Sequence, residues 1–376
     1  MTAPSSVLLA GGGSAGHVSP LLSVADALRR RWPDVEITAL GTAEGLEVRL
    51  VPDRGYPLRT IPRVPMPRRP DASLLRFPGA LSAEIAAAAA VLTDVRADVV
   101  AGFGGYVSTA AYLAARRLRV PYVVHEANTR PGLANRLGAR FTPYVATSFA
   151  GTRLPHAVRT GLPLRRDISR LDRFAGRAAA RAAFGLAPDR TTLLVTGGSL
   201  GAQRLNQTLA ASVPDLRSAG VQVLHLAGAG KGFAPPPPGA PDEPAYVVQE
   251  YCDDMAAAYS AADAVVSRAG ANTVSELTAV GLPGIYVPLP IGNGEQRLNA
   301  EPVVAAGGGL IVADRDFTPE WVRTRLLGWL ADVQGLRAAG EAAASCGVRD
   351  ADERVADLVE AAASGPKALA RKGPGS

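Results

Sequence analysis

Three glycine-rich segments each follow a short apolar run and precede a stretch that is expected to be helical. They are Gly11–His17 (GGGSAGH), Gly102–Ser108 (GFGGYVS) and Gly197–Gln203 (GGSLGAQ). Glycine lets the backbone turn tightly and approach a ligand, and the free N–H groups of a helix start favour a phosphate or a developing negative charge. One such loop is often only a tight turn. Three of them, divided between the two halves of the chain, predict a ligand site lined by helix N-termini.

Histidine is scarce, and the four histidines are His17, His125, His156 and His225. A single histidine is more often structural than catalytic, but His17 ends the first glycine-rich segment, where a helix is expected to open. The positive end of a helix dipole disfavours a charged imidazolium. A neutral ring is what a general base requires, so His17 is the candidate catalytic base.

A fourth segment with chemical potential is Ser267–Glu276 (SRAGANTVSE). An apolar run ends at Ser267, and a helix is expected to start near Ala271, which puts Glu276 in its second turn. A carboxylate there can accept hydrogen bonds from both hydroxyls of a ribose. The alternative is an ordinary solvated glutamate on a helix.

Gly11, Gly13 and Gly16 also match the GxGxxG pattern of dinucleotide sites. Such a site requires an acidic residue at the end of the second strand. The second apolar run ends at Gly41 and Thr42, and Glu36 lies near its start. The sequence therefore disfavours NAD or NADP as a ligand.

Short apolar runs alternate with longer Ala-, Leu- and Arg-rich stretches, which is typical of α/β proteins with buried parallel strands. In the first half the expected strands are Val7–Ala10, Val35–Leu40, Asp98–Ala101 and Pro121–His125, and the expected helices are Pro20–Arg31, Ser82–Val95 and Tyr106–Leu118. In the second half the expected strands are Thr192–Thr196, Val221–Leu226, Tyr246–Val248, Ala264–Ser267 and Ile285–Val287, with helices at Leu171–Phe184 and Ala202–Ala211.

The β/α pattern restarts after Arg165, so two domains of similar size are expected. The predicted boundaries are 1–163 for the first domain and 164–345 for the second. The last expected helix, about 350–364, packs back on the first domain, and the Gly/Pro-rich residues 365–376 form a flexible tail.

Composition limits the classes of function. The chain has 376 residues and a net charge of +6, and its basic residues are almost all arginine. Because the arginines are scattered rather than gathered with aromatic residues, nucleic acid is not an expected partner. Cys252 and Cys346 are the only cysteines, so neither a disulfide framework nor a CxxC metal site is expected.

No apolar run approaches the length of a membrane span, and the N-terminus lacks the pattern of a signal peptide. The segment Ile61–Pro78 carries five prolines and is not expected to form a regular helix. It mixes Arg63, Arg68, Arg69 and Arg76 with Leu74, Leu75 and Phe77. Two readings stay open: an ordinary long connection, or a basic apolar loop that contacts a membrane.

Taken together, these motifs resemble the bacterial UDP-N-acetylglucosamine:N-acetylmuramyl-(pentapeptide) pyrophosphoryl-undecaprenol N-acetylglucosamine transferases. The resemblance runs from Val7 to about Ala363. The matching stretches are GGGSAGHVSP, GFGGYVS, VVHEAN, GLPLR, GGSLGAQRLNQT, EYCDDMAAAYSAAD, SRAGANTVSE and GEQRLNA. The family implies a GT-B fold, in which two Rossmann-like domains face a cleft and UDP-GlcNAc binds mainly to the C-terminal domain.

The resemblance also implies roles for particular residues. The catalytic position is His17, and the implied acceptor contacts are Gly104, Gly105, Tyr106 and Glu126. Glu276 is assigned to the ribose, the Cys252 backbone to the uracil and Ser199 to the diphosphate. The implied donor contacts are Ser14, Ala15, Gly16, Asn128, Arg165, Ser199, Cys252, Ala271, Asn272, Thr273, Val274, Ser275, Glu276, and Glu295 or Gln296.

Two departures from the family pattern bear on these assignments. Ser14 and Ala15 replace a Thr-Gly pair in the first glycine loop, so Ala15 requires an ordinary negative φ. The stretch before Glu295 and Gln296 is Ile-Gly-Asn-Gly rather than basic, which leaves open which of the two contacts the sugar.

The function implied by the family is inverting transfer of GlcNAc to a polyprenyl-pyrophosphate-linked muramyl peptide, which makes the chain a hexosyltransferase of cell-wall synthesis. No cofactor or metal is expected, because helix N-termini and Arg165 can hold the diphosphate and Asp253-Asp254 is expected to cap a helix. The expected location is the cytoplasmic face of the membrane, with anionic lipid and cell-wall synthesis proteins as candidate partners. The alternatives are a tailoring glycosyltransferase, a nucleotide-sugar epimerase and a non-catalytic nucleotide-sugar-binding subunit.

Overall fold

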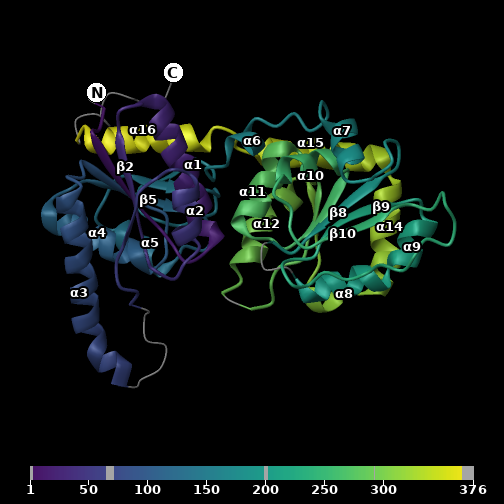
Figure 1. The fold of residues 1–376 in the computed structure, drawn as a ribbon, viewed down its shortest axis with the longest axis horizontal. Helices are drawn as coiled ribbons and strands as arrows, with labels where there is room; N and C mark the ends of the chain where they lie inside the picture. The colour runs from purple at the N-terminus through teal and green to yellow at the C-terminus, as the bar shows by residue number, and fades with distance from the viewer. Residues whose placement is uncertain (1–2, 65–71, 199–201, 292, 366–376) are drawn as a thin grey trace. The chain divides into compact units, whose positions relative to one another are not determined.

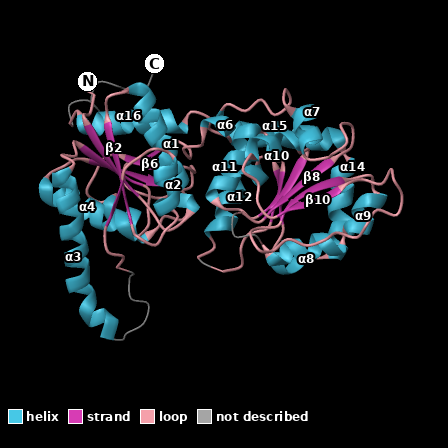
Figure 2. Cartoon of the chain, in the orientation of Figure 1, coloured by secondary structure: helices cyan, strands magenta, loops and turns pink. Residues whose placement is uncertain are grey.

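The computed structural model describes residues 3–64, 72–198, 202–291 and 293–365, and the chain divides into two units (Figures 1 and 2). The first unit combines Met1–Arg165 with Asp350–Ser376, and the second is Arg166–Arg349. The chain therefore leaves the first unit after Arg165, two residues beyond the boundary predicted from the sequence, and returns to it with its last helix.

A sheet of seven parallel strands forms the centre of the first unit, in the order β3-β2-β1-β4-β5-β6-β7. The strands are β1 Ser6–Ala10, β2 Glu36–Gly41, β3 Leu58–Thr60, β4 Val99–Gly102, β5 Tyr122–Glu126, β6 Val145–Thr147 and β7 Ala157–Arg159. All five residues of β1 are buried, which explains why this strand reads as a continuous apolar run rather than an alternating one.

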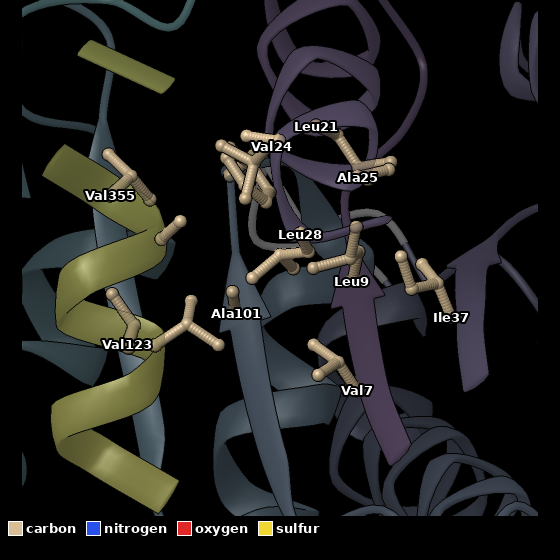
Figure 3. Packing of buried hydrophobic residues seen from close by; sticks show 14 of the residues in the cluster. Val7, Leu9, Leu21, Val24, Ala25, Leu28, Ile37, Ala101, Val123 and Val355 are labelled. Carbon is tan, nitrogen blue, oxygen red and sulfur yellow. The ribbon is translucent and has the colours of Figure 1, made fainter. Parts of the chain in front are cut away.

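Helices cover both faces of this sheet (Figure 2). They are α1 Ala15–Arg31, α2 Glu47–Asp53, α3 Ala72–Asp94, α4 Tyr106–Leu118, α5 Leu133–Gly138 and α16 Ala351–Ala363. Val7 and Leu9 of β1 pack in a cluster with α1 and α16 (Figure 3), whereas Leu8 and Ala10 pack with α3 and α4. This alternation follows from the two-residue period of a strand.

The last helix of the chain, α16, packs on α1 and against β4 and β5. Val355 and Val359 are fully buried there, and Figure 3 shows Val355 in the same cluster as Val123 of β5. At the rim of this contact, Arg30 lies 2.7 Å from Asp352 and Arg31 lies 2.7 Å from Asp357. Apolar burial and ion pairs together join the C-terminal segment to the N-terminal unit.

The second unit contains a sheet of six parallel strands in the order β10-β9-β8-β11-β12-β13. Its strands are β8 Thr192–Thr196, β9 Gln222–Leu226, β10 Tyr246–Gln249, β11 Ala264–Ser267, β12 Gly284–Tyr286 and β13 Gly309–Ile311. Its helices are α6 Arg166–Ser169, α7 Arg177–Ala183, α8 Gln203–Ala211, α9 Val213–Ser218, α10 Met255–Ala261, α11 Ala271–Val280, α12 Glu295–Ala305, α13 Pro319–Trp321, α14 Leu327–Ala331 and α15 Val333–Cys346, with a 3₁₀ turn at Asp314–Asp316 and a π-helical segment at Val322–Leu326.

Three helices, α1, α7 and α3, differ from their predicted bounds by more than one residue. Helix α1 begins at Ala15 rather than Pro20, because the Ser14 carbonyl accepts the N–H groups of His17 and Val18 and starts the helix earlier. Helix α7 does not begin at Leu171, because the Asp172 side chain accepts the N–H groups of Phe174 and Ala175 and forms a turn in place of the first helical turns.

The expectation for Ile61–Pro78 was wrong in its second half, since α3 starts at Ala72 and contains Pro78. A proline inside a helix removes one N–H donor, and the alanine-rich remainder of α3 maintains the helix. Residues 65–71 and the side chains of residues 72–76 lie outside the described part. Within the described ranges, no helix combines the length and the apolar character that a membrane span requires.

Candidate active site

Strand order places the first candidate site at the edge where the strands of the first sheet end. Strands β2 and β3 lie on one side of β1, and β4 and the later strands lie on the other. The loops after β1 and β4 therefore leave the sheet at its topological switch point, where open α/β sheets bind ligands. These loops, Gly11–Ser14 and Phe103–Gly105, belong to the first and second glycine-rich segments.

The loop after β1 fixes the orientation of His17. Gly13 has a φ of +85°, which favours glycine, and Ser14 is extended before the helix starts. His17 Nδ1 lies 3.0 Å from the Gly12 carbonyl oxygen and 3.3 Å from Ser14 Oγ. A carbonyl can only accept, so Nδ1 donates the proton and Nε2 is the basic nitrogen of the neutral ring. Ala15 stands where the family pattern has a glycine. It is helical, so it has the ordinary negative φ that an alanine requires there.

The loop after β4 lies directly against this ring. Gly104 and Gly105 have φ values of +101° and +84°, and a Cβ atom on Gly104 would lie 2.9 Å from His17 Nε2. A Cβ atom on Gly105 would lie 3.0 Å from the Gly12 carbonyl oxygen. Ser108 Oγ accepts the Gly104 N–H at 3.0 Å and lies 3.0 Å from the Ala10 carbonyl oxygen. Glycine is thus required at both positions for the two loops to meet. Tyr106 is the first residue of the helix that follows.

A buried polar network shapes the loop after β5. The Glu126 carboxylate accepts the N–H groups of Asn128 and Gly132 and the side-chain amide of Asn135, each at 2.9 Å. Tyr112 in turn donates to Asn135 Oδ1 at 2.8 Å. Glu126 is almost fully buried, so the structure gives it the role of holding the loop that carries Asn128. Its assignment as an acceptor contact stays a prediction.

Sequence reasoning missed Glu47, which lies under the first glycine loop. Glu47 opens α2, and its fully buried carboxylate accepts the Gly13 N–H at 2.8 Å and the Thr42 N–H at 2.9 Å. Burial by itself raises the pKa of this carboxyl, but hydrogen bonds from Thr42 and Gly13 outweigh it and lower the pKa below its ordinary value. The signal in the sequence was an acidic residue soon after the second strand. A dinucleotide site requires an acidic residue at the end of that strand, so an acidic residue further along the chain led to no prediction.

The second unit has its own switch point, between β8 and β11. The third glycine-rich segment follows β8, and the loop Arg268–Gly270 follows β11 and leads into α11. Ala271 and Val274 of α11 are buried, whereas Asn272, Thr273 and Ser275 are half-buried. Ser199 lies outside the described residues.

Glu276 is held by a neighbouring helix. Its Oε2 accepts a hydrogen bond from Tyr259 of α10 at 2.6 Å. Cys252 lies in the loop between β10 and α10, and its thiol donates to the Asp254 carbonyl at 3.2 Å. Asp254 Oδ1 accepts the Ala257 N–H at 2.8 Å, which confirms that this aspartate caps a helix.

Glu295 and Gln296 are the first two residues of α12, after the loop that follows β12. Gln296 Oε1 accepts the N–H groups of Ala269 at 3.2 Å and Leu289 at 2.9 Å, so it ties the loop after β11 to the loop after β12. Glu295 accepts the Asn293 N–H at 3.2 Å. The side-chain orientation of Gln296 is therefore fixed by the backbone, and the choice between the two residues stays open.

The predicted site residues thus form two groups, each at the carboxyl edge of one sheet. Ser14, Ala15, Gly16, His17, Gly104, Gly105, Tyr106, Glu126 and Asn128 belong to the first unit, and Cys252, Ala271–Glu276, Glu295 and Gln296 to the second. Arg165 is half-buried at the end of the first unit's main segment. Among the described residues, no cluster of three or more His, Cys, Asp or Glu side chains is arranged to hold a metal ion.

Comparison with known proteins identifies the family. Residues 7–147 match the Glycosyltransferase family 28 N-terminal domain, and residues 192–355 match the C-terminal domain of the same family. A Nocardioides protein named UDP-N-acetylglucosamine--N-acetylmuramyl-(pentapeptide) pyrophosphoryl-undecaprenol N-acetylglucosamine transferase is 59% identical over 354 residues, which cover 94% of this chain and 97% of that protein. The crystal structure of Acinetobacter baumannii MurG is 29% identical, with a TM-score of 0.76 over 95% of this chain and 99% of that one.

The chain belongs to the MurG family. The resemblance noted in the sequence and the expected GT-B fold class, with two Rossmann-like parallel sheets, are both confirmed. The calicheamicin glycosyltransferase CalG4 has the same fold, with a TM-score of 0.67 over 99% of this chain and all of that one, but only 18% identity. The roles of individual site residues in this chain stay predictions.

Buried histidines make the stability of this MurG chain depend on pH. Burial lowers the pKa of His225 to about 4, and Tyr246 and Asn206 hold its ring at 2.7 and 3.0 Å. Because the unfolded histidine has an ordinary pKa near 6.5, the unfolded chain binds more protons below that pH. The free energy of unfolding should be unaffected by His225 above pH 6.5 and should fall by about 1.4 kcal/mol per pH unit between pH 6.5 and 4.

Urea unfolding of wild type, His225→Gln and His156→Gln between pH 5.5 and 7.5 measures this slope. His225→Gln should flatten it, whereas the exposed His156 provides the matched control and should leave it unchanged. Glu84, whose pKa is raised to about 7 by burial, opposes the trend in the first unit. The comparison therefore uses the unfolding transition of the second unit, and equal slopes there would contradict the assignment.

Proposed function

We propose that this chain transfers N-acetylglucosamine from UDP-N-acetylglucosamine to undecaprenyl-pyrophosphoryl-N-acetylmuramyl-pentapeptide, which converts lipid I to lipid II in peptidoglycan synthesis. Identity to transferases named for this reaction over nearly the whole chain carries the proposal. Two sets of loops, one at the carboxyl edge of each sheet, support it with different chemistry. One presents a histidine with a basic Nε2, and the other presents a carboxylate on a helix after the central strands.

In the proposed reaction, the acceptor hydroxyl attacks the anomeric carbon of an α-linked sugar, and the bond from that carbon to the UDP oxygen breaks. The hydroxyl proton passes to His17 Nε2, and the product is β-linked. The Nδ1–H bond to Gly12 supports this role, because it keeps the second ring nitrogen unprotonated in the neutral ring. Gly104 and Gly105 beside the ring, and Tyr106 after them in the chain, are the proposed acceptor contacts.

The leaving UDP carries the developing negative charge, so its diphosphate requires positive groups. We assign this task to the N–H groups at helix starts and to Arg165, without a metal ion. Glu276 is the proposed acceptor for the ribose hydroxyls, and its hydrogen bond from Tyr259 supports this by fixing the carboxylate. The Cys252 backbone is the proposed partner of the uracil. The proposed partners of the sugar are Asn128 and either Glu295 or Gln296.

Transfer of labelled GlcNAc from UDP-GlcNAc to a soluble lipid I analogue tests the function directly. Wild type should form a β-linked product, and activity should survive EDTA. His17→Ala should lower kcat by roughly 10² to 10⁴, the usual range for an acid–base group, while calorimetry shows unchanged UDP binding.

His156→Ala is the matched control for that assay. No transfer to the analogue, with transfer to a small natural product instead, would favour a tailoring enzyme. Epimerised sugar without acceptor would favour an epimerase, and UDP-GlcNAc binding without turnover would favour a binding subunit. A near-normal kcat in His17→Ala would restrict this histidine to shaping the loop.

The donor site makes a separate prediction. Glu276→Ala should raise the KM for UDP-GlcNAc by roughly 10- to 100-fold, because two ribose hydroxyls lose a charged acceptor worth about 1.5 to 3 kcal/mol. Tyr259→Phe should raise it less, since that variant keeps the carboxylate and loses only the bond that orients it. A folded Glu276→Ala protein with the wild-type KM would remove Glu276 from the donor site.

We also propose that the enzyme acts at the cytoplasmic face of the membrane, where a polyprenyl acceptor is anchored. Leu74, Leu75 and Phe77 with Arg68, Arg69 and Arg76 are the proposed contact with anionic lipid. Most of this segment lies outside the described side chains, so the proposal rests on its sequence. Arg63, the fourth arginine of the segment, lies 3.5 Å from Glu44 and over the Tyr106 ring, so it is left unchanged in the variant that tests this contact.

Flotation with liposomes tests this surface. Wild type should float with vesicles that contain anionic lipid and float less with neutral ones. A variant in which Arg68, Arg69 and Arg76 are changed to Gln should lose that difference, whereas the same change at the exposed Arg315, Arg323 and Arg337 of the second unit should not. Equal flotation of both variants would discard the segment as the lipid contact.

A further inference from the structure

One peptide group connects the buried carboxylate of Glu47 to the imidazole of His17. The N–H of Gly13 donates to Glu47 Oε2 at 2.8 Å. The carbonyl of the same peptide, which belongs to Gly12, accepts from His17 Nδ1 at 3.0 Å. Because a peptide group is planar, fixing its N–H also fixes the direction of its carbonyl. The carboxylate and the ring are therefore held at opposite ends of a single rigid unit.

The surroundings of Glu47 are built to hold a carboxylate in one position. Its Oε1 accepts the backbone N–H and the hydroxyl of Thr42, both at 2.9 Å. A Cβ atom on Gly12, Gly41 or Gly45 would come closer to the Glu47 side chain than real Cβ atoms approach. The absence of a side chain at these three glycines thus leaves room for the Glu47 side chain. Glu47 has no exposed area, so its carboxylate does not face a ligand.

The charge of the carboxylate adds to its geometric effect. A hydrogen bond to an ionised acceptor is stronger than a neutral one, and hydrogen bonds in a chain polarise one another. Polarisation of the Gly12–Gly13 peptide by Glu47 makes the Gly12 carbonyl a better acceptor for Nδ1–H. A better acceptor at Nδ1 stabilises the positive charge that His17 gains when Nε2 takes a proton, as a carboxylate behind a catalytic histidine does.

We propose that Glu47 is a positioning residue for the transfer reaction, which orients His17 and supports its protonation through the Gly12–Gly13 peptide. The inference rests on the proposed function, because it assigns to Glu47 an effect on the base of that reaction. Glu47 does not touch substrate in this scheme. Its loss should therefore appear in kcat and in the state of the His17 ring rather than in nucleotide binding.

Glu47→Gln tests the proposal with minimal change in shape. The amide lacks the charge and cannot accept hydrogen bonds from both Gly13 and Thr42, so kcat should fall by about 10- to 100-fold. The Kd for UDP should stay within about twofold. In a His17→Ala background the same substitution should lower kcat by less than about twofold, because the ring through which Glu47 acts is gone.

The matched control is Asp98→Asn. Asp98 Oδ2 accepts the N–H groups of Ser5 and Ser6 at 2.7 and 3.0 Å, at the opposite end of the same strand β1. Asp98→Asn should lower the thermal midpoint of the protein and leave kcat near the wild-type value. If Glu47→Gln fails to fold, Glu47→Asp keeps the charge and shortens the reach by one methylene group, and it should reduce kcat in the same direction.

A measurement on the protein without substrate tests this inference separately from the proposed function. In ¹⁵N-histidine NMR spectra, with His17→Ala for assignment, the neutral His17 ring of wild type should carry its proton on Nδ1. Glu47→Gln should shift the ring toward a mixture of tautomers, and Asp98→Asn should not. A wild type without transferase activity would overturn the proposed function alone. Wild-type kcat in Glu47→Gln, an equal loss in the His17→Ala background or an unchanged tautomer would overturn the inference.

Discussion

All strands in both sheets run parallel to their neighbours, and this constraint places the chemistry of the molecule. Parallel strands end at one edge, so the loops after β1, β2, β4 and β5 meet there although long stretches of sequence separate them. The same holds for the loops after β8, β10, β11 and β12. Hydrogen bonds that cross between these loops, such as Gly13 N–H to Glu47 and Ala269 N–H to Gln296, then hold neighbouring loops together.

Close approach of backbone segments is the second requirement at these edges. The loop after β4 reaches the loop after β1 only because Gly104 and Gly105 lack side chains and adopt positive φ values. Buried carboxylates then satisfy the N–H groups that such irregular loops leave without helix or sheet partners, as Glu47 does for Gly13 and Glu126 for Gly132. The two acids act as fixed supports for loops whose other side remains available to ligands.

The sequence predicted the parts of the fold that have a strong periodic pattern. Helix Tyr106–Leu118 and strands Thr192–Thr196 and Ala264–Ser267 were predicted with their observed bounds, and the last helix to within about one residue at each end. The short edge strands β3, β7 and β13 were missed, because three residues carry no detectable period. The prolines at positions 20 and 78 led to wrong helix bounds, since the local penalty was outweighed by the rest of each helix.

The candidate site was predictable to a similar degree and for related reasons. Glycine loops, His17 and Glu276 stand in recognisable local patterns, and the structure places them at strand ends as expected. Glu47 has no local signal of its role, because its partner Gly13 is brought close only by the pairing of β1 with β2. The Tyr259–Glu276 bond likewise joins side chains of two separate helices, α10 and α11, of the second unit.

The return of α16 to the first unit has a consequence for how the protein is made. While the ribosome synthesises Arg166–Arg349, the N-terminal sheet has already emerged, but the helix that covers Val99 and Val123 has not yet been made. At ordinary elongation rates this interval lasts on the order of 10 to 40 s. During that time an apolar face of the nascent chain is open to chaperones, proteases and other chains, and folding of the N-terminal half becomes complete only after α16 has been made.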